Sequence, residues 1–208
     1  MCGEKRFYIK MLTTMEQKFN SFSHLSDLDL LQNFCMQEGE IVDYQKGDLM
    51  EREGEPSNWF GFVSLGCFRY LTKGISDGRE HITWFSFEGE FVGDYPCCLN
   101  GRPAQTTIEA MIPSCIYRIK GELLTEWFCR NPQTMQLRNQ ISEHLLFQAR
   151  ERYIDFHRGT PLDRYNLLLH RCPGIVEHLS LKDIASFLSI SPQQLSRIRR
   201  NITFREEL

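Results

Sequence analysis

Residues 179–201 constrain the fold of this chain more than any other stretch of its sequence. They read LSLKDIASFLSISPQQLSRIRRN. Ser180 and Asp183 have the spacing of a capping box at the start of a helix. Ser191 and Gln194 repeat that spacing further along the stretch. The stretch therefore predicts two short helices joined by a tight turn.

The small and apolar residues of this stretch indicate how the two helices meet. Ala185 follows Ile184 in the first helix, where a steep crossing of two helices requires a small side chain. Ser189 lies in the turn, where many such pairs carry glycine because the backbone needs a positive φ. These features resemble the helix-turn-helix of bacterial DNA-binding proteins, whose second helix enters the major groove. The other positions that we expect to be buried are Leu188, Ile190, Leu195 and Ile198.

The second helix of the pair is predicted to present a polar, basic face. Between residues 191 and 205 the chain carries four arginines and no acidic residue. Gln can bond adenine at two positions, Arg can bond guanine at two positions, and Arg or Ser can hold phosphate. The alternative is an ordinary helical hairpin with a solvated basic face, which the caps and the single sign of charge disfavour. The predicted DNA-binding residues are Ser191, Gln193, Gln194, Ser196, Arg197, Arg199 and Arg200.

The composition excludes several other classes of protein. A formal net charge of −3 over 208 residues does not suit a chain that binds nucleic acid over its whole surface, so DNA contact must be local. The eight cysteines include no C-x-x-C pair, and we expect reduced thiols in a cytoplasmic protein without a metal site. No apolar run approaches the ~20 residues of a membrane span.

Short strands separated by glycine are predicted between residues 40 and 119. An aromatic and apolar run over residues 59–71 is broken by two glycines, Gly61 and Gly66, and Asp77-Gly78 is a hairpin-turn signal. This pattern is typical of a small β-barrel or roll. The other strands are expected near residues 41–44, 49–50, 81–87, 106–110 and 115–119.

A long helix is predicted to begin at Asn131-Pro132 and to end before Gly159. Its length of roughly 40 Å exceeds what one small barrel covers, so we expect the same helix of a second chain to pack against it. The alternative is that its apolar stripe packs wholly within one chain. The stripe consists of Leu137, Ile141, Leu145, Ala149, Tyr153 and Phe156.

Two further helical segments flank these elements. Thr160 and Asp163 have capping-box spacing at the start of a helix that should end before Cys172-Pro173. Residues 19–34 carry apolar side chains every third position, and Ser26 with Asp29 offers a helix cap. The predicted divisions are a flexible extension over residues 1–18, a sensor domain with flanking helices over 19–130, a dimerisation helix over 131–158 and a DNA-binding domain over 159–208.

Several short motifs stand in a fixed order along the chain: Gly47-Asp48, Gly66-Cys67-Phe68-Arg69, Gly89-Glu90-Phe91-Val92-Gly93-Asp94, Asn131-Pro132, Ile184-Ala185 and Leu195-Ser196-Arg197-Ile198. Their order and spacing resemble the Crp/Fnr family of bacterial transcription regulators. The resemblance implies an α+β fold with an N-terminal β-roll of the cyclic nucleotide-binding type (a double-stranded β-helix or jelly roll), a long dimerisation helix and a C-terminal helix-turn-helix domain. It also implies a homodimer that reads an inverted repeat, with Arg197 as a base-contacting arginine.

The resemblance is weakest at the effector pocket. In relatives that bind cyclic nucleotides, a Gly-Glu pair takes the ribose hydroxyl, and Arg-Ser or Arg-Thr holds the cyclic phosphate. Here Asp94 is a shorter acid, Ala104 stands in place of the arginine, and Arg102 lies two residues early. We therefore predict no cofactor, with cyclic AMP or another small effector as the alternative, and side chains such as Tyr95 and Leu99 could fill the pocket. The pocket residues are Gly93, Asp94, Tyr95, Arg102, Ala104 and Gln105.

Two other functions are compatible with a β-roll. A cupin-type metalloenzyme needs two or three histidines and a carboxylate inside the barrel, and residues 40–119 contain only His81. A cyclic-nucleotide-binding module that regulates a protein partner is the other alternative, which the basic helix disfavours. We thus predict no enzyme activity, and double-stranded DNA, a second copy of the chain and RNA polymerase as partners.

Overall fold

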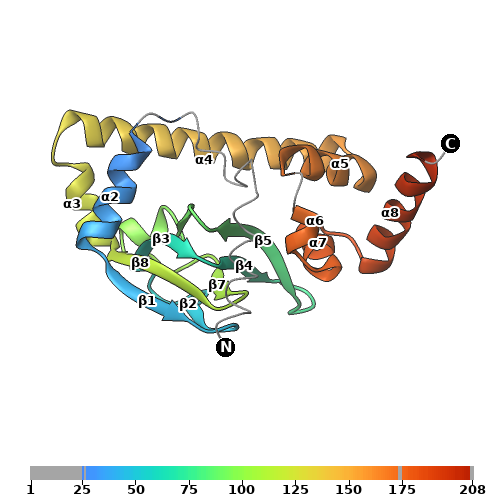
Figure 1. Cartoon of the computed structure of the whole chain (residues 1–208), viewed down its shortest axis with the longest axis horizontal. Helices are drawn as coiled ribbons and strands as arrows, with labels where there is room; N and C mark the ends of the chain where they lie inside the picture. Colours follow the sequence, from blue (N-terminus) through green and yellow to red (C-terminus); the bar gives the residue numbers. More distant parts are fainter. Residues whose placement is uncertain (1–24, 26, 173–174, 207–208) are drawn as a thin grey trace. The chain divides into compact units, whose positions relative to one another are not determined.

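The computed structural model describes residues 25, 27–172 and 175–206, and these form two compact units. The first unit ends at Gln148 and contains every strand of the described chain, and the second begins at Ala149 and is helical (Figure 1). The division falls inside α4 (Pro132–Arg158). The predicted extension over residues 1–18 and the start of the 19–34 segment lie outside the described residues.

Two four-stranded antiparallel sheets form the roll of the first unit, in the orders β1-β8-β3-β6 and β2-β7-β4-β5. Their inner faces supply a core in which Val63, Phe68 and Ile116 are fully buried. This confirms the predicted β-roll. The strands are β1 (Glu40–Tyr44), β2 (Leu49–Glu51), β3 (Trp59–Leu65), β4 (Cys67–Lys73), β5 (Glu80–Phe87), β6 (Phe91–Val92), β7 (Thr107–Ala110) and β8 (Ser114–Lys120).

Only one of the two glycines in the 59–71 run breaks the strand. Gly66 has a φ of +93°, and a Cβ there would lie 2.1 Å from the hydroxyl oxygen of Ser114, so glycine is needed where β3 turns into β4. Gly61 instead lies within β3, where it pairs with both Arg118 and Val92. The expected break at Gly61 is therefore wrong, because that backbone keeps its ladder hydrogen bonds.

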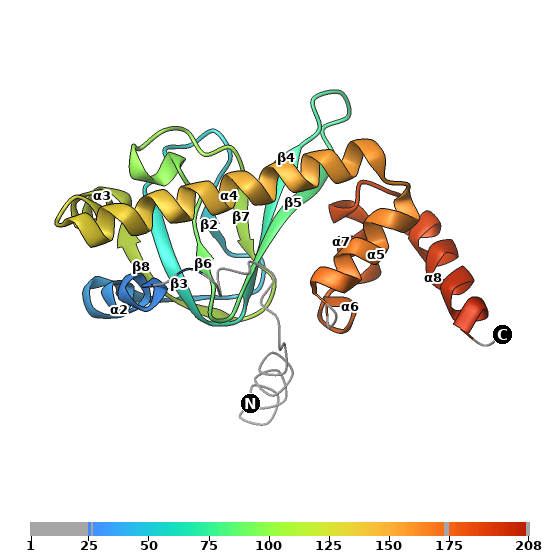
Figure 2. The same cartoon turned by 90° about the horizontal axis from the view of Figure 1, so that it is seen from above.

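Three helices pack together at one end of the roll (Figures 1 and 2), namely α2 (Leu28–Glu38), α3 (Gly121–Phe128) and the first half of α4. Phe34 stacks on Trp127 with ring centroids 4.8 Å apart, an arrangement that contributes about 0.5–1.5 kcal/mol beyond burial. Asp27 occupies the N-cap of α2, and its side chain makes no capping hydrogen bond. The expected capping residue Ser26 lies outside the described residues.

Helix α4 begins and ends where the sequence predicted. The side-chain oxygen of Asn131 accepts the Thr134 N–H at 2.9 Å, and Gly159 donates its N–H to the Asp155 carbonyl at 2.9 Å. The predicted stripe, however, does not lie on one interface. Leu137 and Ile141 are buried in the core of the first unit, and Leu145 packs against that core partly buried, because α2 and α3 cover that side of the helix.

The second unit packs four helices after the end of α4. Thr160 and Asp163 form the predicted capping box, and the helix that follows stops at Cys172. Arg152 of α4 lies over the ring of Phe187, with its guanidinium carbon 4.2 Å from the centroid. The helices are α5 (Pro161–Arg171), α6 (Ile175–His178), α7 (Leu181–Phe187) and α8 (Pro192–Glu206).

Three properties of the described residues bear on the composition argument. No described helix is long and apolar enough to cross a membrane, and no group of three or more potential metal ligands occurs among the described side chains. Burial raises the pKa of the Cys35 thiol to about 12. No disulfide joins the described cysteines, namely Cys35, Cys67, Cys97, Cys98, Cys115, Cys129 and Cys172.

Candidate functional site

The two helices α7 and α8 begin at the predicted caps. The Ser180 hydroxyl accepts the Asp183 N–H at 3.1 Å at the start of α7. At the start of α8, the Ser191 hydroxyl accepts the Gln194 N–H at 3.1 Å, and the Gln194 side-chain oxygen accepts the Ser191 N–H at 3.4 Å. Local side-chain chemistry therefore fixes both helix starts, and the predicted pair of helices is confirmed.

The turn between them has the backbone that the sequence required. Ser189 has a φ of +54°, and the Ile190 N–H reaches back to the Ala185 carbonyl at 3.0 Å. A left-handed conformation costs a residue with a Cβ about 1–2 kcal/mol, so this turn stores a small strain that glycine would not have. Ala185 and Leu195 are both fully buried where α7 meets α8, which confirms the predicted small residue at the crossing.

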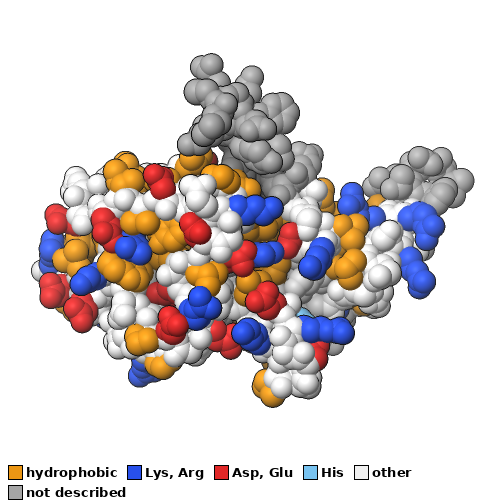
Figure 3. Space-filling view, turned by 90° about the horizontal axis from the view of Figure 1, so that it is seen from below, with side chains coloured by type: hydrophobic (Ala, Val, Ile, Leu, Met, Phe, Trp, Pro, Cys, Tyr) orange, Lys and Arg blue, Asp and Glu red, His pale blue; other side chains and the backbone are white. Residues whose placement is uncertain are grey.

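The outward face of α8 lies opposite the buried Leu195. Gln193, Arg197 and Arg200 stand at spacings of four and three residues, which places them on one side of the helix, and all three are exposed. Arg199 lies nearer the flank of the helix, where its charge lowers the pKa of Tyr165 against the raising effect of burial. Figure 3 shows blue side chains gathered over this end of the visible face.

Two of the seven predicted DNA contacts already have partners. Ser191 and Gln194 use their side-chain oxygens in the α8 capping box, so they also fix the start of the helix. The remaining predicted contacts are all exposed: Gln193, Ser196, Arg197, Arg199 and Arg200.

The predicted effector residues do not converge on one pocket. Asp94 is buried, and one of its carboxylate oxygens accepts the backbone N–H groups of Gln105 and Thr106. Ala104 is also buried, whereas Arg102 is exposed, although its charge acts on the Cys97 thiol, as that of Asp94 also does. The structure therefore unites Asp94 with the 104–106 backbone and leaves Arg102 outside.

The residues next to Asp94 turn toward the helices. Gly93 donates its N–H to the Tyr70 hydroxyl at 3.1 Å, and the Tyr95 hydroxyl lies 2.8 Å from the Ser142 hydroxyl of α4. Leu99 is buried in the core shared with α2 and α3. Tyr95 and Leu99, which we suggested as side chains that could fill the pocket, therefore both contact the core shared with the helices.

Sequence reasoning missed a second buried carboxylate, Glu51 at the end of β2. Its oxygens accept the Ser57 hydroxyl at 2.8 Å and the Trp59 N–H at 3.2 Å. Burial raises the pKa of Glu51, the charge of Asp94 raises it further, and the Ser57 and Trp59 hydrogen bonds oppose the shift. In the sequence Glu51 stands among charged residues of a loop, and no local signal distinguishes it from its exposed neighbours.

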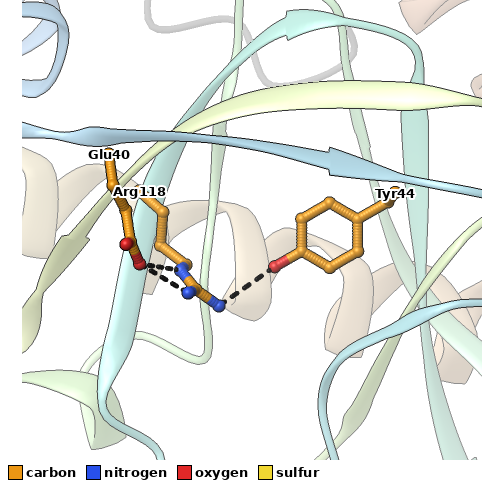
Figure 4. Close-up of polar contacts among 3 residues, drawn as sticks. All are labelled: Glu40, Tyr44 and Arg118. Atoms are coloured by element: carbon orange, nitrogen blue, oxygen red, sulfur yellow. Dashed lines mark hydrogen bonds and ion pairs between the residues drawn. The ribbon is translucent and has the colours of Figure 1, made fainter.

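One arginine of the roll could be taken for an anion-binding residue, but its charge is matched. Arg118 donates from Nε to a Glu40 carboxylate oxygen at 2.9 Å and from its terminal nitrogen to the Tyr44 hydroxyl at 3.3 Å (Figure 4). Its guanidinium carbon also lies 3.9 Å from the ring centroid of Trp59. These contacts join β1, β3 and β8, so Arg118 serves the sheet.

Comparisons with known proteins agree with this architecture. Residues 41–131 match the family model of the cyclic nucleotide-binding domain. Curated protein sequences gave no significant match. Among solved structures, the chain is similar to FixK2 from Bradyrhizobium japonicum, with 21% identity, a TM-score of 0.68, and 81% of this chain and 86% of that chain covered.

Two other solved structures are similar over comparable lengths. The c-di-GMP responsive global regulator CLP from Xanthomonas campestris has 18% identity and a TM-score of 0.65, with 86% of this chain and 93% of that chain covered. A CooA mutant from Carboxydothermus hydrogenoformans has 14% identity and a TM-score of 0.69, with 88% and 87% covered. Residues 41–131 therefore match the cyclic nucleotide-binding domain family, and the chain has the fold of the Crp/Fnr-type regulators.

Proposed function

We propose that this chain is a DNA-binding transcription regulator of the Crp/Fnr type. The observation that carries the proposal is the outward face of α8, where Gln193, Arg197 and Arg200 are exposed opposite the buried Leu195. The N-terminal half of such a helix reads base edges in the major groove. A regulator of this kind works in the cytoplasm without enzyme activity, and RNA polymerase is the further protein partner that we propose.

The residues of α8 divide by position into readers of bases and holders of phosphate. Gln193 and Arg197 stand in the first two turns, where a helix inserted by its N-terminus comes nearest the base edges. Arg200 lies one turn further on and Arg199 on the flank, so we assign both to backbone phosphates. Ser196 lies between the two groups and suits either contact.

We further propose that α4 pairs two copies of the chain, through a face other than the one predicted from the full stripe. Tyr153 and Phe156 of the stripe, with Ala149, are exposed. Leu146 continues this face at three- and four-residue spacing and is 69% exposed. A seam with this spacing is typical of two helices packed as a coiled coil. Two copies would place their α8 helices about one DNA turn apart, on an inverted repeat.

The match of residues 41–131 to its family favours a second candidate, a cyclic-nucleotide-binding module that acts on a protein partner. The exposed arginines of α8 disfavour it, since a module without a DNA function has no need of them. The salt dependence of any DNA interaction separates the two candidates, because neutralised phosphates release counterions on binding.

The experiment that tests the proposal is selection of bound sequences from a random duplex pool, with purified protein and no added ligand. We expect enrichment of an inverted repeat. The same selection is run with Arg79→Ala, an exposed arginine of the β4–β5 hairpin, as a matched control that should enrich the same repeat. Enrichment of no sequence by the wild type, both alone and with cell extract added, would contradict a DNA function.

A further inference from the structure

The carboxylate of Asp94 accepts hydrogen bonds from a loop of the roll and so holds this loop closed. The N–H groups of Gln105 and Thr106 both point to the same oxygen of its carboxylate, the second at 3.1 Å, and the Thr106 hydroxyl lies 3.5 Å from that oxygen. Successive backbone N–H groups that converge on one point form a concave anion site of the kind that holds ligand phosphates. In this chain the anion in that site is the carboxylate of Asp94.

The loop that carries these N–H groups is held on its other side as well. The Ala104 N–H donates to the Glu55 carbonyl at 2.8 Å, and the Ser57 N–H donates to the Arg102 carbonyl at 2.9 Å. Glu51 in turn fixes the 57–59 segment through its own buried carboxylate. Two buried carboxylates therefore hold two neighbouring loops, and the local charge is negative.

A cyclic phosphate would meet two obstacles here. It would have to displace Asp94 from the two N–H groups, and it would then lie near the charge of Glu51 in a buried place. Ala104 stands where relatives carry the phosphate arginine, and Arg102, whose charge acts on nearby Cys97, is exposed to solvent. A phosphate that entered while Asp94 stayed charged would add a second anion to a buried place without a paired cation, which is strongly unfavourable.

We propose that Asp94 acts as a built-in substitute for the effector's anion, so that the loop is closed without a ligand and the roll does not take up a cyclic nucleotide. The binding part of this proposal concerns the roll alone, and its regulatory consequence, DNA binding independent of cyclic nucleotides, rests on the proposed function. Tyr95, the next residue, contacts Ser142 of α4 at 2.8 Å, so the closed loop also fixes a contact on the long helix.

The test compares Asp94→Ala with Asp48→Ala. Asp48 is a matched control, because its carboxylate accepts one backbone N–H, from Gln45 at 2.7 Å, in an exposed turn of the same roll. We expect the thermal midpoint of Asp94→Ala to lie on the order of 5 °C below that of the control. Inorganic phosphate at about 50 mM should raise the Asp94→Ala midpoint by about 3 °C and leave wild type and control unchanged, relative to chloride of equal ionic strength.

Titration of the wild type with cyclic AMP and cyclic GMP gives the second readout. We expect no binding heat up to about 1 mM of either nucleotide. Binding of either one to the wild type, or equal midpoints and equal phosphate responses of the two alanine variants, overturns the proposal. Neither readout uses DNA. The proposal for Asp94 can therefore fail while the DNA function stands, and the DNA function can fail while the proposal for Asp94 stands.

If Asp94→Ala does not fold, Asp94→Asn takes its place, because the asparagine oxygen can still accept both N–H groups, which point to one oxygen. Its midpoint should then lie below that of Asp48→Asn, since the loss of charge weakens both hydrogen bonds to Asp94 and only one to Asp48. Equal midpoints of the two asparagine variants would contradict the role of Asp94.

Discussion

The α7–α8 pair and the 94–106 loop of the roll use polar residues in opposite ways. On α8, Gln193, Arg197 and Arg200 are exposed, and they stand opposite the fully buried Leu195. In the roll, Asp94 and Glu51 are buried, and their carboxylates accept hydrogen bonds from the chain's own backbone and from Ser57. One region presents its polar groups outward, and the other satisfies them internally.

Because of this difference, DNA binding by α8 and effector binding by the roll are separate questions, although a match to one family would imply both. A surface of exposed arginines lowers its free energy by meeting phosphate, whereas a buried carboxylate with its partners in place gains nothing from a second anion. The cyclic nucleotide-binding fold of residues 41–131 therefore occurs together with a buried Asp94 that accepts two N–H groups of the chain's own backbone. Substitutions in the two regions test this difference separately.

The largest effect is expected where the outward face of α8 depends on the packing beneath it. Leu195→Ala removes a fully buried side chain between α7 and α8 and should cost about 2–5 kcal/mol in the free energy of unfolding. Chemical denaturation measures the loss, with the exposed neighbour Ser196→Ala as control. Equal stabilities of the two variants would mean that α8 is not anchored through Leu195.

Arg197→Ala should leave the fold intact and weaken binding to the selected inverted repeat. Loss of a bidentate contact to a base costs about 1–3 kcal/mol, or roughly 5- to 150-fold in Kd, and relaxes specificity at one base pair. Fluorescence anisotropy with the selected duplex and a scrambled duplex measures both effects. Arg199→Ala is the internal control, because loss of a phosphate contact should weaken binding to the two duplexes by the same factor. If Arg197→Ala weakens binding to both duplexes by the same factor, Arg197 contacts a phosphate and not a base.

The same contrast explains which parts of the molecule the sequence could predict. The starts of α5, α7 and α8 follow from capping residues three positions apart, and the positive φ of Ser189 follows from the turn between two helices. These are local interactions, which a sequence displays directly. The helix α3 and the two-residue strand β6 were not predicted, because both are short and are stabilised by distant partners.

The burial of Glu51 and of part of the α4 stripe could not be predicted for the same reason, because both depend on distant residues. Nothing near Glu51 in the sequence indicates that it is buried, since its surroundings include Ser57 and the distant Asp94. Leu137 and Tyr153 share one helical spacing, yet α2 and α3 cover Leu137 and leave Tyr153 exposed. Which part of an apolar stripe faces the core is decided by the neighbouring elements.

The buried carboxylate of Glu51 makes stability depend on pH. Because burial raises the pKa of Glu51 above its ordinary value of 4.5, the folded chain binds this proton more tightly than the unfolded chain. The stabilisation is therefore present at low pH and is lost as pH rises through the folded pKa. Glu51→Gln lacks this loss, so the free energy of unfolding of Glu51→Gln should gain on that of the wild type as the pH rises above about 4.5.

Urea unfolding at several pH values measures this gain, with Glu55→Gln, an exposed loop residue, as the control. We expect the effect to be smaller than that of Leu195→Ala, because the Ser57 and Trp59 hydrogen bonds oppose the cost of burial. A constant difference between Glu51→Gln and wild type across the range would mean that Glu51 keeps an ordinary pKa in the folded state.

The smallest effect is expected at the turn of the α7–α8 pair. Ser189→Gly removes the strain of a left-handed residue that carries a Cβ, and the gain is partly offset by the greater freedom of glycine in the unfolded chain. The net stabilisation should be about 0.5–1 kcal/mol by urea unfolding, without a change in Kd for the selected duplex. Ser186→Gly, within α7, is the matched control and should lower stability by a similar amount, because its backbone is helical. A loss of stability in both variants would show that the Ser189 side chain stabilises the turn more than its backbone conformation strains it.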